Sequence, residues 1–317
     1  MVKYFMKRTI ASTFVLAMSS ILIFISIRIL PGDPVLAKYG ASAGATPENI
    51  EALRVEAGIT RPILAQLASW INGLFHGDMG VSYFSGLPVR DLVFERVPAT
   101  LELTFLIILI ACIFSAFFTF IAVRKPGGFG DRIVGYFTSI ALSVPTFIVG
   151  IVLIIFFTLV FRILPSRGYV PISLNLKQNL TFLILPSVTG AIAAVPYLVK
   201  YLRTSILELN NAPFVRTAEG QGVKESRILL RHILPNALVP TLTMLGLIIG
   251  YTLGGVLVIE YMFGIPGIGS LAIEAASTRD YALLQGVAIL IIFLFILTSL
   301  TIDIICGYVD PRLRRKS

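Results

Sequence analysis

Long apolar runs and shorter polar stretches alternate along the whole chain. Six of the runs are long enough to cross a bilayer, which takes roughly 20 apolar residues in a helix. These expected spans cover residues 9–30, 100–123, 133–161, 181–202, 236–259 and 283–309. The pattern therefore predicts an all-α integral membrane protein with six transmembrane helices, in which residues 1–317 form a single transmembrane domain.

Proline and glycine interrupt several of these runs. Pro145 predicts a kink in the third span, because proline removes a helix hydrogen bond. Pro186 and Pro196 predict that the fourth span is bent or locally unwound. In the fifth span, glycines recur every four residues from 246 to 254, which favours close packing of another helix over a lining for a translocation path.

The polar stretch at residues 31–98 carries its own helix signals. Residues 46–48 (Thr-Pro-Glu) place a capping residue, a proline and an acid where a helix begins, and Gly58 would end that helix. A second amphipathic piece runs over residues 62–74. This stretch is therefore expected to form a small helical cap on the outer membrane surface.

A second polar segment, residues 203–235, separates the fourth and fifth spans. Asn210 and Asn211 are suitable capping residues, and Pro213 suits a first helical turn. Residues 228–234 form a further amphipathic run that Pro235 is expected to close. The residues expected on one face of the short helix are Phe214, Thr217, Ala218 and Gln221, and those expected to stop it are Gly220 and Gly222.

Two interpretations of this short helix remain open from the residues alone. A bulky Phe214 beside small residues would suit a helix that docks into a groove on a partner protein. The alternative is a solvated loop whose helix lies on the membrane surface.

Composition and charge add an orientation to the six-span prediction. Hydrophobic residues make up 56% of the chain and charged residues 14%, whereas roughly a quarter of a soluble domain is charged. The net charge of +9 could indicate nucleic-acid binding, but in a membrane protein it is better explained by orientation bias. The termini and the segments on their side hold sixteen of the 26 Lys and Arg against five of the 17 acids, so both termini and residues 203–235 are predicted to be cytoplasmic.

No catalytic grouping emerges from the sequence. It contains no phosphate-binding G-x-x-x-x-G-K-[ST] motif, so transport energy must come from another chain or from an ion gradient. Two histidines are too few and too widely separated for a metal site, and the two cysteines lie in apolar spans. An ion-coupled transporter or channel would need ionisable groups in mid-span, and Asp303 is better explained as an interfacial or paired residue.

The spacing within the cytoplasmic segment resembles a known motif. Residues 216–218 (Arg-Thr-Ala), three residues, Gly222, nine residues and residues 232–235 (His-Ile-Leu-Pro) resemble the EAA loop of ABC importer permeases. The dipeptide/oligopeptide/nickel branch matches best, because it favours Arg-Thr-Ala and a His near the end. Glu219-Gly220 departs from that branch, which carries Arg-Ala, so the charge that the helix offers its partner is altered.

Further short motifs resemble the same branch in the same order. They are Pro31-Gly32-Asp33-Pro34, Gly77-Asp78-Met79-Gly80, Ala99-Thr100-Leu101-Glu102-Leu103, Pro266-Gly267-Ile268-Gly269, Arg279-Asp280-Tyr281 and Asp310-Pro311-Arg312. The early Pro-Gly-Asp-Pro and the large first outer loop look like the B-type transmembrane subunit. The resemblance implies the ABC type I importer permease fold with a cytoplasmic coupling helix.

The resemblance also implies partners and site residues. The partners would be a C-type permease subunit in a heterodimer, two cytoplasmic ATPase subunits that bind ATP and Mg, and an extracytoplasmic solute-binding protein. This chain would bind no cofactor and no nucleic acid, and would lie as a multi-pass protein in the cytoplasmic membrane of a prokaryote. The residues expected to couple to the ATPase are Phe214, Val215, Arg216, Thr217, Ala218, Glu219, Gly220, Gln221 and Gly222, with no catalytic or metal-binding residue.

The expected function is that of a transmembrane subunit of an ATP-driven importer of short peptides. Nickel or a metal–chelator complex is the alternative cargo within the same machinery. A secondary transporter or channel is the alternative from a different class. The sequence does not identify the residues that contact the substrate.

Overall fold

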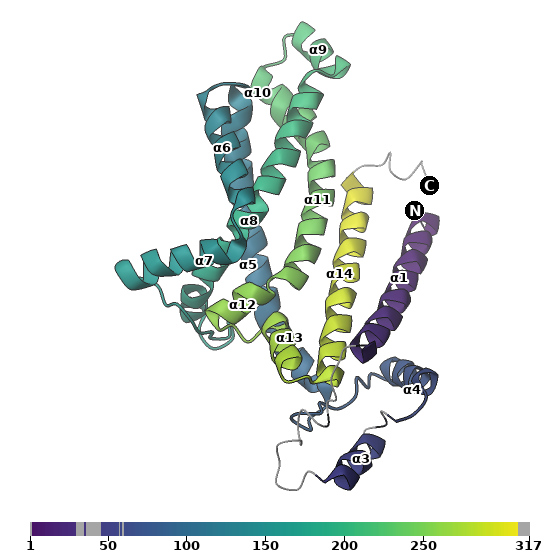
Figure 1. Cartoon of the computed structure of the whole chain (residues 1–317). Coiled ribbons are helices and arrows are strands. Elements are labelled where there is room, and N and C mark those ends of the chain that lie inside the picture. The colour runs from purple at the N-terminus through teal and green to yellow at the C-terminus, as the bar shows by residue number, and fades with distance from the viewer. Residues whose placement is uncertain (1, 30–34, 36–45, 57, 59, 310–317) are drawn as a thin grey trace.

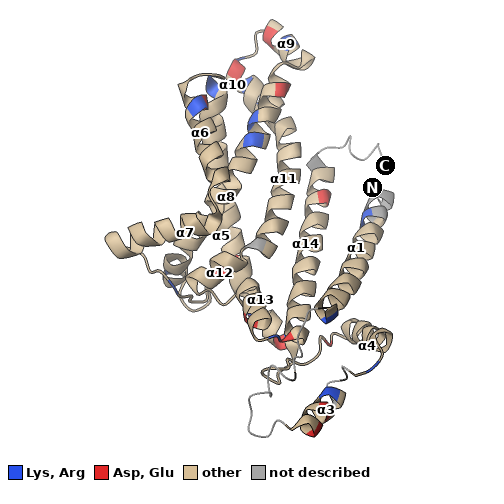
Figure 2. Cartoon of the chain, in the orientation of Figure 1, with Lys and Arg blue, Asp and Glu red and all other residues tan. Residues whose placement is uncertain are grey.

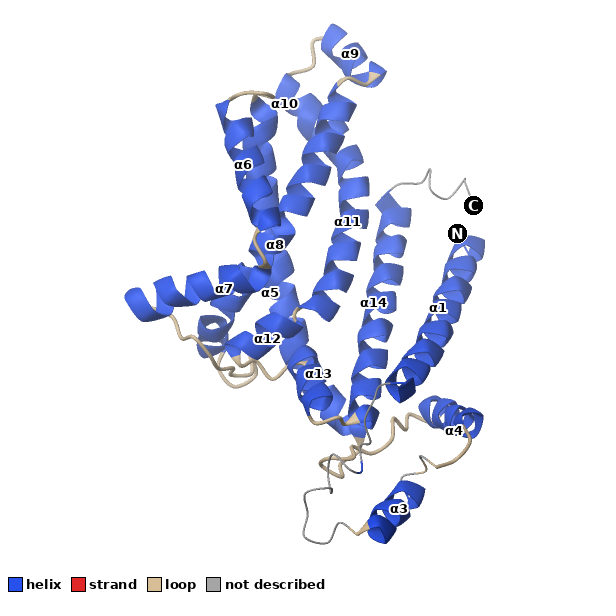
Figure 3. Ribbon diagram, viewed as in Figure 1, coloured by secondary structure: helices blue, strands red, loops and turns tan. Residues whose placement is uncertain are grey.

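The computed structural model describes residues 2–29, 35, 46–56, 58 and 60–309. Across these residues the chain is helical, and its only extended pairing is an isolated bridge between Val81 and Pro88 (Figure 3). The all-α prediction is therefore confirmed. The Pro-Gly-Asp-Pro motif at residues 31–34 and the basic tail at 312–316 lie outside the described residues.

The helices in chain order are α1 (Val2–Ile29), α3 (Pro47–Glu56), α4 (Ile63–Phe75), α5 (Val89–Arg124), α6 (Phe129–Ser143), α7 (Thr146–Ile154) with the π-helical η1 (Ile155–Val160), α8 (Leu176–Asn210), α9 (Pro213–Gly220), α10 (Glu225–Ile228) with the π-helical η2 (Leu229–Ile233), α11 (Leu234–Gly255), α12 (Leu257–Phe263), α13 (Ile268–Ser277) and α14 (Tyr281–Val309).

Five helices in the described part of the chain are long and apolar enough to cross a membrane without a break. They are Arg8–Ile29, Val89–Arg124, Leu176–Asn210, Glu225–Gly254 and Tyr281–Gly307. Two further pairs of helices qualify only together and are sharply bent, Phe129–Ser143 with Thr146–Val160 and Leu257–Phe263 with Ile268–Ser277. The six expected spans thus fall within the range of five to seven that the structure allows.

The expected third span, residues 133–161, is broken and not merely kinked. α6 and the α7–η1 helix meet at 101°. Val144 has extended backbone angles, which the residue before a proline favours, and Pro145 begins the next helix. Because Pro145 has no N–H to donate back to α6, the first helix ends here and the second leaves in a new direction.

Two other spans differ from expectation in their extent. α5 begins at Val89, so residues 89–98, which were assigned to the outer cap, form its first turns. α8 runs from residue 176 to residue 210 and stays helical through Pro186 and Pro196, so it is not unwound there, and the bend that was the other expectation stays a prediction. Both prolines are buried, and α8 packs along α5 and α11, whose contacts hold the helix together.

The helices form a bundle with two distinct ends (Figure 1). The start of α1, the end of α14 and α9 point towards one end, and α3 and α4 lie at the other. Buried apolar clusters follow each other between the ends. One joins the start of α5 to α13 and α14, two lie along α5 and α8, and the last joins the end of α8 to α9 and η2.

The glycine row of the fifth span packs against α14. A Cβ at Gly246 would lie 2.8 Å from the Ile302 side chain, and one at Gly250 would lie 2.4 Å from the Phe295 ring. Since real Cβ atoms do not come this close, only glycine allows α14 to approach here. The packing interpretation of the row is confirmed.

Asp303 on α14 is paired, as expected. Its carboxylate lies 3.2 Å from the Arg8 guanidinium of α1. This ion pair joins the two helices near the end of the bundle at which the chain begins.

Candidate coupling surface and translocation cavity

The short helix α9 forms the tip of one end of the bundle. It runs from Pro213 to Gly220, with proline in its first turn as expected. Its N-cap is Ala212 rather than either asparagine, which corrects the sequence-based prediction. The connection from α8 is so short that Asn210 is the last residue of α8 and Asn211 caps that helix instead.

The turn after α9 depends on Gly222. Its φ is +75°, in the left-handed region that glycine adopts without strain, and its N–H donates to the Glu219 carbonyl at 2.9 Å. The Val223 N–H donates to the Ala218 carbonyl at 3.1 Å, which closes the end of the helix. Gly220, in contrast, is an ordinary last residue of α9.

The two faces of α9 differ in exposure. Val215 is only 1% exposed and belongs to the apolar cluster below the helix, and Ala218 is packed partly against that cluster. Phe214 is 41% exposed, and Thr217 and Gln221 are exposed as well. Ala218 therefore faces the bundle and does not join the outward face on which the sequence pattern placed it.

A continuous helical base supports this tip. Ile206 of α8, Val215 of α9 and the buried Ile228 and Ile233 share one apolar cluster. α10 leads through the π-helical turn of η2 directly into α11, and Pro235 lies inside that helix rather than ending the run. A π-helical turn shifts the hydrogen-bond register just before a residue that cannot donate, so the helix continues past the proline.

Charged residues lie at both ends of the bundle, including the end that carries α9 (Figure 2). Arg216 and Glu219 on α9 are exposed, as are Arg227 and Arg231 beyond it. The exposed surface of this segment therefore has further basic residues beyond α9, while α9 itself carries one charge of each sign.

The base of α8 is joined to α6 by an ion pair. The guanidinium of Arg203 donates twice to the Asp131 carboxylate, with both distances at 2.7 Å. The Gly127 N–H donates to the same carboxylate at 2.8 Å. This arrangement fixes the α5–α6 turn against the helix that carries α9.

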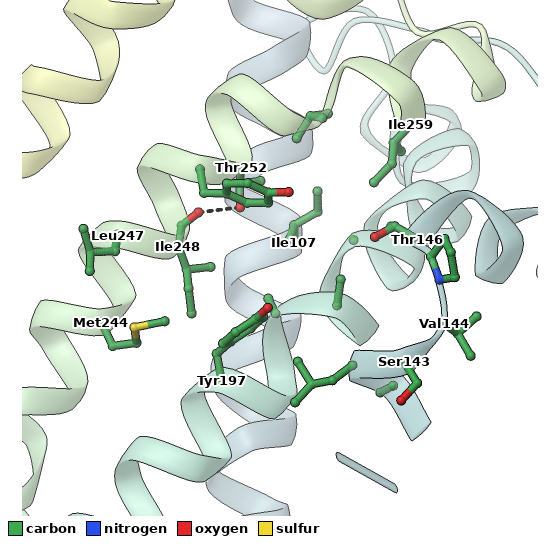
Figure 4. A pocket seen from close by; sticks show the side chains of 18 residues that line it. Ile107, Ser143, Val144, Thr146, Tyr197, Met244, Leu247, Ile248, Thr252 and Ile259 are labelled. Atoms are coloured by element: carbon green, nitrogen blue, oxygen red, sulfur yellow. Dashed lines mark hydrogen bonds between the residues drawn. The ribbon is translucent and has the colours of Figure 1, made fainter. Parts of the chain in front are cut away.

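A cavity of about 540 Å³ opens beside the break between α6 and α7. α5, α8, α11 and α12 complete its wall, and Figure 4 shows the labelled side chains around one common space. Its lining combines apolar side chains with hydroxyl groups and includes no charged side chain. The hydroxyl-bearing residues in the wall are Ser143, Thr146, Tyr197, Tyr251 and Thr252.

One side of this cavity is not covered by the part of the chain that the structure describes. Leu247 and Tyr251 of α11 both line the cavity and are largely exposed, Tyr251 at 78%. The sequence did not single out these residues. Pro145 marked the break beside the cavity, but no local pattern indicated that α8 and α11 would face it.

Buried carboxylates organise the opposite end of the bundle. Glu260 of α12 is fully buried and accepts hydrogen bonds from the Thr100 hydroxyl at 2.6 Å and from the Ser270 N–H at 3.0 Å. The Thr100 hydroxyl oxygen in turn accepts from the Ile268 N–H at 2.8 Å. These bonds tie α5 to the sharp turn between α12 and α13, whose axes differ by 86°.

A second carboxylate holds the turn before α14. Asp280 is 1% exposed and accepts from the Ser82 hydroxyl and from the N–H groups of Tyr83, Phe84 and Leu283. Burial raises the pKa of the Tyr83 phenol, the positive charge of Arg28 opposes this, and the charge of Asp280 adds to it. The loop before α5 is therefore fastened to the α13–α14 connection.

Glu102 provides a third such contact. Its Oε2 accepts from the Tyr169 hydroxyl at 3.0 Å and from the Asn179 side-chain amide at 2.6 Å. Burial, then the hydrogen bond to Glu102, raises the pKa of the Tyr169 phenol. The loop before α8 is thereby attached to α5.

About half of the residues at 260–280 are buried. The buried side chains include those of Phe263, Ile265, Ile268 and Leu271. Exposed positions, such as Arg279, are concentrated near the end of the segment. The buried half of this segment therefore contributes to the core at this end of the bundle.

An all-helical bundle with several membrane spans, an exposed short helix at one end and an uncharged cavity open to one side defines a membrane transport subunit. Two family models match the chain. Residues 108–315 match the binding-protein-dependent transport system inner membrane component, and residues 1–104 match the N-terminal part of such membrane components. The chain belongs to this family of ABC importer permeases, whose members are non-catalytic membrane subunits.

Curated relatives are similar along almost their entire length. A probable peptide ABC transporter permease of Sinorhizobium fredii is 35% identical over 98% of this chain and 99% of its own. A putative peptide transport system permease of Brucella abortus is 35% identical over 98% of each chain. The glutathione transport system permease GsiC of Escherichia coli is 32% identical over the full length of both.

The solved structures show the same fold. The MetNI methionine ABC transporter, in inward-facing conformations, matches with a TM-score of 0.57 at 18% identity, over 69% of this chain and 96% of that chain. The family resemblance and the importer permease fold are thus confirmed. The family assignment excludes the secondary transporter or channel that the sequence had left open.

Proposed function

We propose that this chain moves short peptides across the cytoplasmic membrane of a prokaryote as the B-type half of a heterodimeric permease. The named peptide and glutathione permeases at 32–35% identity over their full lengths support this cargo class. Nickel or a metal–chelator complex is the alternative cargo. The cavity wall offers hydroxyl groups and apolar surface but no His, Cys, Asp or Glu, which suits an organic solute better than a bare cation.

The cavity beside the α6–α7 break supports a place on the translocation path. Its volume of about 540 Å³ lies within the usual range of small-molecule sites, about 300–1,000 Å³. Without charged groups, it would not bind the termini of a peptide tightly, so it would let the solute pass. The exposed side of α11 would be closed by the C-type permease subunit.

The exposed face of α9 carries the coupling part of the proposal. Phe214 is a large apolar group on a tip whose opposite face is anchored by Val215. Burying Phe214 in a groove of an ATPase subunit would contribute roughly 1.5–3 kcal/mol. Residues 214–222 would then transmit ATPase closure through the continuous α8 and α10–α11 helices to the cavity wall.

The remaining partners and the orientation follow from the same proposal. Two ATPase subunits would supply ATP and Mg, and a solute-binding protein would deliver the cargo from outside. Both chain termini and α9 would be cytoplasmic, which agrees with the concentration of Lys and Arg on that side. Residues 31–98 would then lie outside.

The coupling role is tested by replacing Phe214. Phe214→Ala should weaken ATPase association and uptake while leaving membrane insertion intact, because the residue lies outside the spans. Leu230→Ala is the matched control, since Leu230 is also an exposed apolar residue of this segment but lies on η2, off α9. Pull-down of the ATPase subunits and uptake by the reconstituted importer measure the effect. If Phe214→Ala and Leu230→Ala show the same ATPase association and the same uptake, the coupling role of Phe214 is contradicted.

The cargo and the orientation need separate measurements. Mass spectrometry of the ligand retained by the co-purified solute-binding protein should find short peptides, and a bound metal complex would refute the peptide assignment.

Single cysteines at Ser69 and Ser226, in a background without the native cysteines, should react differently with an impermeant maleimide on intact cells. Labelling at residue 226 but not at residue 69 would show that the orientation is the opposite of the one proposed.

A further inference from the structure

The amphipathic helix α4 has an apolar stripe that no part of the described chain covers. Leu64 is 76% exposed and Phe75 is 86% exposed. With Ala68, which is also exposed, they are spaced so that they lie along one side of the helix. α4 contains no Asp, Glu, Lys or Arg, whereas soluble surface helices normally carry charges.

Contacts with α1 place α4 beside the last turns of that span. The ring of Trp70 lies 5.4 Å from the ring of Phe24 on α1. Phe24 precedes the end of α1 at Ile29 by five residues, or about 7–8 Å along a helix. Helices at a membrane interface lie with their apolar face about 5–10 Å deep, at the boundary between headgroups and acyl chains.

Arg28 lies near the same end of α1 as the contact between Phe24 and Trp70. Residues 9–27 carry no charged side chain, so Arg28 is where this span reaches the polar interface. Its guanidinium lies 3.6 Å from the centroid of the Phe24 ring, and its Nε donates to the Gln66 side chain of α4 at 2.9 Å. Trp and Arg side chains at one depth are typical anchors of a membrane interface.

α1 has an exposed apolar surface towards the end that α4 contacts. Leu22, Ile25 and Ile29 are all exposed, which is expected of a span that faces lipid. In Figure 1, α4 lies across the end of α1 rather than extending its axis. The stripe on α4 would therefore lie at the level where the lipid-facing surface of α1 ends.

We propose that α4 is an interfacial helix whose stripe of Leu64, Ala68 and Phe75 inserts among phospholipids of the adjoining leaflet. In the orientation proposed above this is the outer leaflet. The helix would hold the segment before α5 at the membrane surface, and it would do so in the absence of any other protein.

Environment-sensitive labels on single cysteines test this placement. Leu64→Cys and Phe75→Cys are compared with Ser69→Cys, an exposed position on the polar side of α4, after Cys112→Ala and Cys306→Ala. The purified full chain is placed in vesicles of phosphatidylcholine and phosphatidylglycerol. Nitroxide-bearing lipids should quench the labels at residues 64 and 75, iodide in the water should not, and the label at residue 69 should show the reverse.

Equal quenching by iodide at all three positions would overturn the proposal. So would loss of lipid quenching at residues 64 and 75 on addition of the C-type permease or the solute-binding protein, since the stripe would then be a protein docking surface.

The native chain gives a second measurement without substitution, because Trp70 is its single tryptophan. Its emission should be quenched more by a nitroxide near the lipid headgroup than by one near the chain terminus.

Discussion

The tip at one end of the bundle and the turns at the other are held by different interactions, although the Arg203–Asp131 ion pair also braces the base of α8. At the α9 end, a cluster of apolar side chains supports a tip whose outer face carries exposed Phe214. At the other end, the buried carboxylates of Glu260 and Asp280 accept hydrogen bonds from hydroxyl and backbone N–H groups. Apolar contacts are non-directional, whereas hydrogen bonds fix distances and angles.

This difference fits the tasks proposed for the two ends. A coupling tip must move with its partner while its base stays assembled, and a cluster of aliphatic side chains permits small shifts. The opposite end joins segments that are far apart in the sequence, such as Thr100 and Ile268, and holds them in one arrangement. We expect substitutions at the carboxylate end to reduce stability and substitutions at the tip to reduce coupling.

The largest effect is expected from Asp280→Ala. It removes the acceptor for a hydroxyl group and three N–H groups in a buried site. Hydrogen bonds to a charged group contribute roughly 1.5–3 kcal/mol each, so a loss of at least about 3 kcal/mol in unfolding free energy is expected. Thermal unfolding of the purified chain in lipid nanodiscs measures it.

Asp78→Ala is the matched control for this substitution. Asp78 is exposed, and its carboxylate accepts a hydrogen bond from the Gly80 N–H at 2.8 Å. Its removal should shift the unfolding temperature little. Comparable shifts for both aspartates would show that the carboxylate end is not the rigid one.

A smaller effect on stability is expected from Gly267→Ala. The added Cβ would lie 2.2 Å from the Glu260 carboxylate, which is fully buried and hydrogen-bonded. Overpacking of this kind typically costs about 1–3 kcal/mol, because side chains or backbone must shift. Gly135→Ala on α6 meets no atom within 4 Å and should leave the unfolding temperature unchanged or slightly higher. If the thermal unfolding curves of the two variants are alike, a Cβ at residue 267 does not strain the site around Glu260.

The smallest effect on stability, but a clear one on coupling, is expected from Gly222→Val. A side chain in the left-handed conformation costs about 1–2 kcal/mol, and no neighbouring atom lies within 4 Å, so the strain stays local to the turn. Hydrolysis of ATP stimulated by the loaded binding protein should fall, because α9 is misaligned. Gly220→Val, at the last residue of α9 and without a positive φ, should retain more stimulation. If both behave like the native chain, the turn after α9 does not set its direction.

Local sequence patterns predicted many features of this structure. Apolar runs fixed the helical membrane class, Pro145 marked the break beside the cavity, and the short helix from Pro213 to Gly220 was expected within a residue or two. Each of these features depends on residues close together in the chain. The positive φ of Gly222 belongs with them, because a helix end and a glycine are enough to indicate it.

Other features required the folded chain. The sequence pattern could not show that Asn211 caps α8 or that Ala218 faces the bundle, because both depend on how tightly α8, α9 and α10 are joined. The bond between Thr100 and Glu260 links residues 160 positions apart. Periodicity along a helix indicates which residues share a face, but only the packing of distant helices decides what that face meets, and that packing creates the buried carboxylate sites and the cavity.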